Sequence, residues 1–445
     1  MSKYTLRHLA ELMDVSSFVN KNVGGVCVDT RLLQPNDLFF ALPGARVDGH
    51  AFVSEAAAKG ASAAVVSRNF TAHLPEFPLI RVDDPMASFQ YLAARLIKMH
   101  SQRVIAVTGS LGKTTTKEFI THLLKPKYRV SSSKGNQNSQ IGLPLSIIND
   151  TSQQDEIIVL EMGMTHVGNI KKLVEIAPPE VALITTTNLV HACNFDTLAD
   201  IGRAKAEIFS SPKTRVGIVG REIVNFDEIC HIGNCKKVSI STENREADYY
   251  LEILSEKMQL HARECNLIFD KLPVPGKHNI HNFLCAAMAA RFVGVSWEEI
   301  ISALPALKLP ERRLEFVERQ GILFVNDSYN AATASMKAAL QSLPEPKQGG
   351  KKIAVLGEML ELGEHSAKAH KEVGAFALDY VDKLLCFGDG CKVMAEEWSK
   401  QGRYAEYHES RAGVVNALRN QVSIGDVVLL KGSRAKEVWK VLEEL

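Results

Sequence analysis

One short segment restricts the fold of this chain more than any other. The segment 108–116 reads TGSLGKTTT; it follows the apolar, β-rich run 104–108 and opens a helical stretch at 117–124. In such a unit, glycines let backbone amides close around phosphate oxygens, and the helix amino terminus favours negative charge. Lys113 would meet the β and γ phosphates, and the Thr114 hydroxyl would ligate magnesium. The residues expected against the nucleotide are Gly109, Ser110, Leu111, Gly112, Lys113, Thr114 and Thr115.

This loop is a shortened form of the general phosphate-loop pattern. That pattern places a glycine five residues before Gly112, where this chain has Val107. The alternative is an ordinary strand-to-helix turn with a surface lysine. That alternative does not explain why a strand, the sequence Gly-x-x-Gly-Lys-Thr and a helix occur together here. We therefore expect nucleotide-phosphate binding by a variant loop.

The strand runs around the loop indicate α/β architecture in three domains, since 445 residues exceed one core at about 100 to 200 residues per domain. Short strands and one helix before residue 83 predict a small α/β domain. Apolar runs alternating with helices predict a doubly wound parallel sheet in the centre and a Rossmann-like α/β domain at the end. The expected boundaries are 1–83, 84–310 and 311–445, the last placed at the proline-bearing segment 304–310.

Charge and composition exclude several classes of protein. The net charge of +1 balances 52 basic against 51 acidic side chains, which removes the electrostatic argument for a nucleic-acid or membrane-surface binder. No run of about 18 apolar residues predicts a membrane span, and the first residues do not resemble a secretory signal. The 8 cysteines form no Cys-x-x-Cys pair, which disfavours a zinc or redox site. We expect a cytoplasmic protein, acting as a monomer.

Two polar side chains follow strands of the predicted central sheet. Glu161 comes after the run 157–160, and His191 lies in the loop after 181–184. In open parallel sheets ligands bind beyond the carboxyl ends of the strands, which is also where the phosphate loop lies. In isolation, Glu161 could be an ordinary solvated carboxylate, and His191 could be a loop histidine whose hydrogen bonds are made within the protein. Their shared edge favours magnesium ligation by Thr114, Glu161 and His191.

The chain resembles the Mur ligases over all three predicted domains. The stretches that carry the resemblance are DTR at 29–31, FFAL at 39–42, DGH at 48–50, 108–117, GNQN at 135–138, IGLP at 141–144, EMG at 161–163, His191, AKAE at 204–207, GKHN at 276–279 with Asn282, DSYNA at 327–331, LGEMLELG at 356–363 and KGSR at 431–434. Arg312 stands where the family usually has glycine, and Thr333 where proline is common, so the local loop shapes are expected to differ.

The resemblance implies roles for these residues. The first domain would bind the UDP end of a sugar nucleotide through Asp29, Thr30, Arg31, Asp48 and His50. Lys205 would be carbamylated and would help hold the second of two magnesium ions, although a helical lysine is by default a solvated charge. The residues implied around ATP are Asn138, Asn279, Asn282, Arg313, Asp327, Tyr329 and Asn330, and those implied around substrate are Lys431, Ser433 and Arg434.

The resemblance also implies the reaction. ATP would phosphorylate the terminal carboxylate of UDP-N-acetylmuramoyl-tripeptide, and the amine of D-alanyl-D-alanine would attack the acyl phosphate, which completes a peptidoglycan precursor. Lys113, Lys205, His191 and Glu161 would be the catalytic set. The third domain lacks the Asp-Asn-Pro-Arg motif of diaminopimelate-adding relatives. The alternatives are a sibling ligase, such as the diaminopimelate-adding enzyme or a folate polyglutamate ligase, and a nucleotide-gated switch, for which the guanine-reading Asn-Lys-x-Asp motif is absent.

Overall fold

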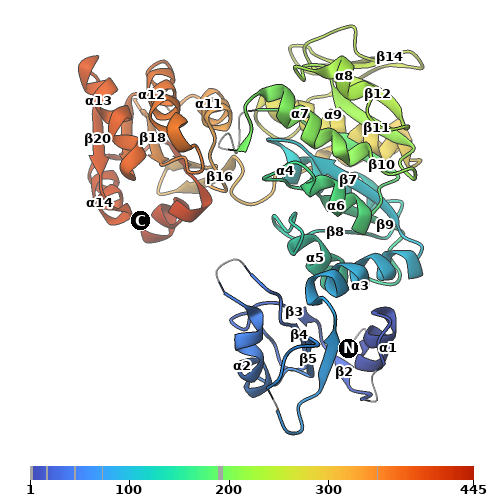
Figure 1. Ribbon diagram of the computed structural model, residues 1–445. Coiled ribbons are helices and arrows are strands. Elements are labelled where there is room, and N and C mark those ends of the chain that lie inside the picture. Colours follow the sequence, from blue (N-terminus) through green and yellow to red (C-terminus); the bar gives the residue numbers. More distant parts are fainter. Residues whose placement is uncertain (1–3, 17–18, 45–46, 73, 189–193, 348) are drawn as a thin grey trace.

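The computed structural model describes the whole chain except residues 1–3, 17–18, 45–46, 73, 189–193 and 348. Figure 1 shows three α/β bodies in sequence order, with the blue amino-terminal body below the green central one and the orange-red body beside it. The predicted three-domain α/β fold is confirmed. No helix within the described ranges is long and apolar enough to span a membrane.

The first body is built on a small parallel sheet. Its strands lie in the order β3 (Val26–Cys27), β4 (Leu38–Phe40), β5 (Ala63–Ser67) and β6 (Leu79–Val82). The remaining elements are the antiparallel pair of β1 (Tyr4–Thr5) and β2 (Asn22–Val23), α1 (Leu6–Leu12), the 3-10 helix η1 (Gly49–Phe52) and α2 (Val53–Ala58).

The long helix α3 (Pro85–Met99) joins this sheet to the central body. It begins sharply because the Asp84 carboxylate accepts hydrogen bonds from the first backbone amides and a proline occupies the first turn. Phe89 on its buried face lies 5.0 Å from the Phe40 ring of β4, centroid to centroid. One apolar core therefore runs from the first sheet through α3 into the central body.

The central body contains a sheet of nine strands. Their order is β15 (Asn266–Asp270), β14 (Lys257–Ala262), β13 (Tyr249–Ile253), β12 (Lys236–Ser241), β11 (Val216–Gly220), β10 (Val181–Ile184), β7 (Arg103–Thr108), β9 (Ile157–Glu161) and β8 (Val130–Ser132). The pairs from β8 to β13 are parallel, as predicted, but β13, β14 and β15 pair antiparallel. The central sheet is therefore parallel over most of its width and becomes mixed at this edge.

Helices cover both faces of the central sheet because its strands alternate their side chains between two cores. On β7, Ile105 and Val107 face one core and Val104 and Ala106 the other. The first face carries α4 (Lys113–Leu124), α9 (Lys277–Phe292) and α10 (Trp297–Ala303), and the second carries α3, α5 (Gly142–Asp150) and α6 (Asn169–Ile176). Two further helices of this body are α7 (Leu198–Ala206) and α8 (Phe226–Cys230), and α7 lies on the side toward the third body in Figure 1.

The third body has a six-stranded sheet. Its order is β16 (Glu315–Arg319), β17 (Ile322–Asn326), β21 (Val427–Lys431), β18 (Lys352–Gly357), β19 (Lys383–Phe387) and β20 (Ala405–His408), parallel except for β16. One face packs on α11 (Thr333–Gln341), α12 (Ser366–Ala377) and α13 (Lys392–Lys400), and the other on α14 (Arg411–Gln421) and α15 (Lys440–Glu444). The strand β21 is the last strand in the sequence, yet it lies in the middle of this sheet.

Candidate active site

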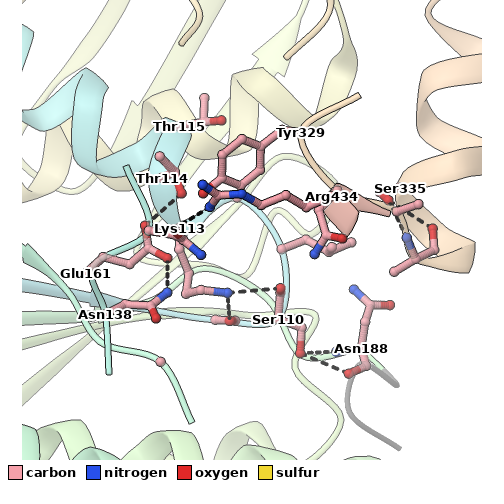
Figure 2. Close-up of a pocket in the computed structure, with 18 of the residues that line it drawn as sticks. Ser110, Lys113, Thr114, Thr115, Asn138, Glu161, Asn188, Tyr329, Ser335 and Arg434 are labelled. Carbon is pink, nitrogen blue, oxygen red and sulfur yellow. Dashed lines mark hydrogen bonds between the residues drawn. The ribbon is translucent and has the colours of Figure 1, made fainter. Parts of the chain in front are cut away.

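A cavity of about 1430 Å³ lies between the central and third bodies. The central body forms one wall, with the phosphate loop and residues at the carboxyl ends of its strands. The third body forms the opposite wall, with loops at the carboxyl ends of β17 and β21. Open parallel sheets bind ligands beyond these strand ends. Figure 2 shows side chains of both walls pointing into the same space.

The phosphate loop joins β7 to α4 and turns sharply at Gly112. That residue is the N-cap of α4 and has φ +80°, a left-handed conformation that glycine adopts without strain. A Cβ at this position would lie 2.2 Å from Oδ1 of Asn282 on α9. The helix amino terminus thus opens directly into the cavity, with its amides directed at any anion held there.

The residues after β10 hold the loop in shape. The backbone amide of Ser110 donates to the Thr186 carbonyl at 2.8 Å, and the amide of Leu111 donates to the Thr186 hydroxyl at 3.3 Å. The Ser110 hydroxyl donates to the Asn188 carbonyl at 2.9 Å. The sequence analysis did not identify Thr186 and Asn188 as site residues. The one feature that could have indicated them is that they are polar and closely follow a buried strand.

Lys113 begins α4, and its amine turns back onto the loop. Nζ donates to the Gly109 carbonyl at 2.8 Å and to the Ser110 carbonyl at 3.2 Å. Burial lowers the pKa of this amine, an effect that the Glu161 carboxylate opposes. The positive charge therefore lies among phosphate-loop carbonyls and close to a carboxylate.

Glu161, at the end of β9, is buried against two polar partners. The Thr114 hydroxyl donates to Oε2 at 2.7 Å, and the Asn138 amide donates to Oε1 at 2.6 Å. The strand-end expectation therefore places this carboxylate correctly beside the phosphate loop. His191 falls outside the described residues.

This oxygen-rich group suits magnesium, which binds through one or two carboxylates and completes its shell with phosphate and water. Within the described ranges, no group of three or more His, Cys, Asp or Glu side chains could hold a metal. Glu161, the Thr114 hydroxyl and the oxygens of a phosphate ligand are oxygen donors of the kind that such an ion prefers.

Lys205 is buried near the end of α7 and lines the cavity, with 5% of its surface exposed. Burial, and then the nearby charge of Lys113, hold the pKa of its amine well below the usual range for lysine. Such an environment favours the neutral, nucleophilic form of the amine. The default expectation of a solvated helical lysine is wrong here.

Two asparagines at the start of α9 form the side of the cavity next to the phosphate loop. The Asn282 amide donates to Oδ1 of Asn279 at 3.1 Å, and the Asn279 amide donates to the Pro275 carbonyl at 2.7 Å. Both side chains are buried, and their spacing of three residues puts them on one face of the helix. Nearby, the His281 ring nitrogen lies 2.9 Å from the Thr185 carbonyl, a contact that the sequence did not reveal.

The third body contributes aromatic and cationic groups. The Arg313 guanidinium lies 4.2 Å from the centroid of the Tyr329 ring, and that of Arg434 lies 5.5 Å from it. Nε of Arg313 and the hydroxyl of Tyr329 are buried without a hydrogen-bond partner among the described residues. Buried polar groups normally have partners, so this wall fits a ligand that supplies acceptors.

The KGSR segment divides into a structural and an exposed part. The buried Lys431 amine pairs with the Asp327 carboxylate at 2.5 Å and donates to the Asn330 carbonyl at 3.1 Å. The Ser433 hydroxyl accepts from the Leu360 amide at 2.9 Å. Arg434, by contrast, reaches across the cavity and donates to Oδ1 of Asn136 at 2.5 Å.

The predicted residues of the first body are not among those that line this cavity. Arg31 pairs with Asp29 at 2.5 Å and lowers the pKa of that carboxyl to about 2, chiefly through its hydrogen bond. The Thr30 carbonyl accepts from Lys59 at 2.9 Å. His50 lies 2.7 Å from the Asp48 carboxylate through Nδ1, and its Nε2 accepts from the Ser67 amide. These residues would have to bind a different part of any long ligand.

Comparison with protein families gives three matches along the chain. Residues 22–89 match the Mur ligase family catalytic domain, residues 107–290 the Mur ligase middle domain, and residues 312–434 the Mur ligase glutamate ligase domain. The family descriptions therefore fall on all three bodies of the fold.

Individual relatives match over full length. The UDP-N-acetylmuramoyl-tripeptide--D-alanyl-D-alanine ligases of Bacillus subtilis and Escherichia coli are 34% and 32% identical, each covering 100% of this chain and 99% of their own length. A crystal structure of MurF from Acinetobacter baumannii matches with a TM-score of 0.87 at 27% identity, covering 99% of this chain and 98% of that one. MurF ligase from Thermotoga maritima, in complex with ADP, matches with a TM-score of 0.79 at 28% identity, covering 94% and 96%.

Proposed function

Because this chain belongs to the Mur ligase family, we propose that it joins D-alanyl-D-alanine to UDP-N-acetylmuramoyl-tripeptide, with ATP as the source of energy. The observation that carries the proposal is full-length similarity to ligases with this named activity. A diaminopimelate ligase and a bifunctional folylpolyglutamate synthase/dihydrofolate synthase match at 16% and 19% identity, which shows a shared fold alone. The product would be a UDP-N-acetylmuramoyl-pentapeptide for peptidoglycan synthesis, made in the cytoplasm.

We propose the following chemistry at the cavity. A terminal carboxylate oxygen of the tripeptide attacks the γ-phosphorus of ATP, and the bond to the β–γ bridging oxygen breaks as ADP leaves. The dipeptide amine then attacks the acyl carbon, a proton is released from the nitrogen, and inorganic phosphate departs. The first step makes a poor electrophile reactive, and a cavity enclosed by two bodies limits hydrolysis of the acyl phosphate.

The chain's own residues support the phosphoryl step. The α4 amino terminus and Lys113 line the cavity, and both would offset the charge that develops during transfer. Glu161 and Thr114 would hold a magnesium ion, which supplies Lewis-acid stabilisation of the phosphate oxygens when bound. Arg313 and Tyr329 would contact the nucleotide from the other wall.

Lys205 fits the proposal of a carbamate that helps to hold a second magnesium ion. Carbamate formation joins the lysine nitrogen to the carbon of CO₂ and releases a proton, so it needs a neutral amine. The buried position of Lys205, which lowers its pKa, favours that form. His191 is proposed as a further metal ligand.

The first body is proposed to bind the UDP end of the sugar nucleotide through Asp29, Thr30, Arg31, Asp48 and His50. We propose domain boundaries near residues 83 and 310, since each separates two of the sheets. A monomer is proposed as the active form, and light scattering on the purified protein would test that.

The deciding experiment measures phosphate release from ATP and magnesium. Purified protein receives either UDP-N-acetylmuramoyl-tripeptide with D-alanyl-D-alanine, or the UDP-muramoyl dipeptide with meso-diaminopimelate. Stoichiometric release only with the first pair supports the proposal. Release that requires diaminopimelate identifies a sibling ligase, and release without any acceptor identifies a nucleotide hydrolase; either overturns it.

A further inference from the structure

The helix that carries Lys205 is held at both ends by side chains that do not line the cavity. Lys205 lies at the penultimate position of α7, and Glu207 follows two residues later in the 3-10 helix η3 (Glu207–Phe209). A long, flexible lysine side chain reaches a fixed point only if its backbone is fixed. The contacts that restrain α7 therefore bear on where the Lys205 amine lies.

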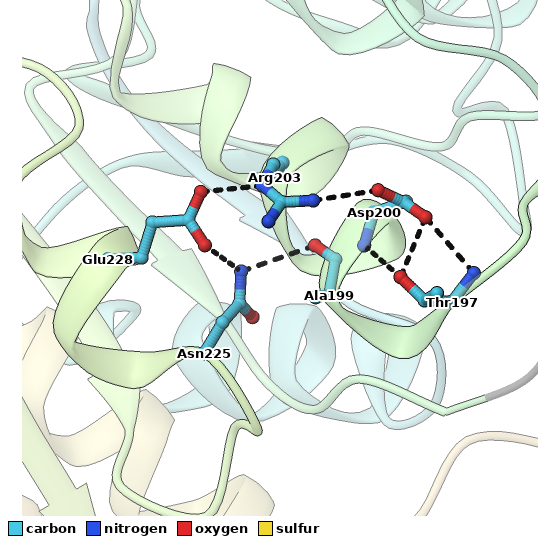
Figure 3. A network of polar contacts seen from close by, with 6 residues as sticks. All are labelled: Thr197, Ala199, Asp200, Arg203, Asn225 and Glu228. Atoms are coloured by element: carbon cyan, nitrogen blue, oxygen red, sulfur yellow. Dashed lines mark hydrogen bonds and ion pairs between the residues drawn. The ribbon is translucent and has the colours of Figure 1, made fainter.

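Figure 3 shows the contacts along the first part of α7. The Arg203 guanidinium pairs with Glu228 of α8 at 2.5 Å and with Asp200 at 2.7 Å. The Asn225 amide donates to the Ala199 carbonyl at 3.2 Å. A Cβ on Gly202 would lie 2.3 Å from Oδ1 of Asn225, so glycine lets the two helices approach closely.

The charged pairs of this network are exposed, so salt and water weaken them. They restrain the flank of α7 away from Lys205. The restraint next to Lys205 comes from a different side chain and acts on a different helix.

Glu207 caps the amino terminus of α6. Its Oε1 accepts from the Gly168 amide at 2.6 Å and its Oε2 accepts from the Lys171 amide at 3.0 Å. The N-cap residue of α6 is Gly168 itself, which has φ +84° and no side chain to satisfy these amides. A carboxylate at this position also interacts favourably with the helix dipole.

The loop that leads into α6 forms part of the cavity wall. Gly163, Met164, Thr165 and His166 line the cavity, as does Asn169 in the first turn of the helix. The Asn169 side chain accepts from the Thr165 and His166 amides, both at 3.1 Å, so the loop and the helix terminus form one unit. Glu207 therefore links the backbone beside Lys205 to this wall.

We propose that Glu207 is a positioning residue that clamps the end of α7 onto the 163–169 wall and so fixes the approach of Lys205 to the reacting groups. The proposal rests on the function proposed above only in assigning Lys205 a part in the reaction. The clamp itself is a structural statement that can be measured without substrate.

The test compares Glu207→Ala and Glu207→Gln with Glu175→Ala, an exposed glutamate of α6 outside the clamp. Hydrogen–deuterium exchange without ligands should rise in peptides covering 164–171 and 198–206 in E207A, but not in E175A. Ligation should lose about tenfold in kcat, with the KM for ATP changed less than about twofold. E207Q, which keeps an acceptor but loses the charge, should lie between E207A and wild type in both measurements.

Each other outcome overturns the proposal. Faster exchange with an unchanged kcat means that the clamp is structural only, and a lower kcat without faster exchange means that Glu207 acts by another route. If E207A does not fold, E207Q decides in the same way: intermediate exchange and kcat support the clamp, and wild-type values for both overturn it. A wild-type protein without ligase activity overturns the proposed function, while the exchange data still show whether the clamp exists.

Discussion

Lys113 is restrained by the loop to which it belongs. Its amine donates to two loop carbonyls and lies near Glu161, so its charge is placed before any nucleotide arrives. Replacing it with alanine removes a preorganised cation, and we expect kcat to fall by about 10²- to 10³-fold or more, with weaker ATP binding. Steady-state kinetics and calorimetric titration would measure both. Lys125→Ala, at the exposed end of the same helix, is the matched control, and unchanged turnover in K113A would contradict the assignment.

Gly112 allows a stability prediction at the same loop. Alanine there would have to adopt φ +80°, and its Cβ would overlap the Asn282 amide, which is bonded to Asn279. We expect Gly112→Ala to lower the free energy of unfolding by about 1 to 3 kcal/mol. Urea denaturation would measure this. Gly135→Ala, where a Cβ meets no atom within 4 Å, separates the cost of positive φ from that of the overlap. Equal losses in the two variants would contradict the steric argument.

The sequence predicted the position of a functional residue where that position depends on residues nearby in the chain. The phosphate loop was recognisable from nine consecutive residues, and the strand end predicted that Glu161 would lie beside it. The burial of Lys205 was not readable, because it depends on packing between α7 and the cavity rather than on neighbours in sequence. The catalytic and binding roles of these residues stay predictions until variants are measured.

At the scale of elements, the buried parallel strands were predictable and the polar edge strands were not. The strands β7, β9, β10 and β11 are apolar runs that pack on both faces, which gives a clear signal. β15 exposes most of its residues, and β20 reads AEYH, so neither shows such a run. These segments form strands because they pair with neighbouring strands of the sheet. Pairing between segments that are distant in the sequence cannot be recognised from local composition.

The helix α12 carries a buried histidine, His370, whose protonation should make the free energy of unfolding depend on pH. His370 donates from Nδ1 to the Ser366 carbonyl at 2.8 Å, and its Nε2 accepts from the Met359 amide at 2.9 Å, so the ring must be neutral. Burial lowers its pKa below the usual 6.5, against the opposing effects of the Ser366 carbonyl and Glu358. The unfolded chain therefore binds the proton first as the pH falls.

The stability that His370 contributes should be complete above about pH 6.5 and should decline as the pH falls from there toward the lower pKa of the folded protein. The largest possible slope from one proton is about 1.4 kcal/mol per pH unit. Urea denaturation of wild type and His370→Gln from pH 8 to pH 5 would isolate this effect. The variant, which cannot take up the proton, should show the smaller slope, and parallel profiles would contradict the prediction.

At the scale of the whole molecule, one contact spans the cavity. Arg434 donates to Asn136 across a sequence separation of 298 residues, joining the third body to the loop that also carries Asn138. Nothing in the sequence indicated that these two residues meet, because the relative placement of two sheets depends on packing between bodies. The sequence predicted three domains, and the structure adds the cavity that two of them share.

Loss of this contact should loosen the arrangement of the two bodies. We expect Arg434→Ala and Asn136→Ala each to lower kcat/KM by about five- to tenfold and to increase the radius of gyration in small-angle X-ray scattering without ligands. The double variant should lose little more than either single one, since all three remove the same bond. Fully additive losses, or an unchanged radius of gyration, would contradict a bridging role.

The position of β21 has a consequence for how the chain is made. The central sheet needs no residue beyond 270, so the ribosome can release a complete set of its strands while the third body is still being synthesised. The third sheet differs, because β21 lies between β17 and β18 and is the last of its strands to emerge. Until residue 431 is available, β17 and β18 each lack one of their two neighbours and expose an unpaired backbone edge, which can pair with another chain and cause aggregation. Chaperone demand during translation should therefore concentrate on the final third of this polypeptide.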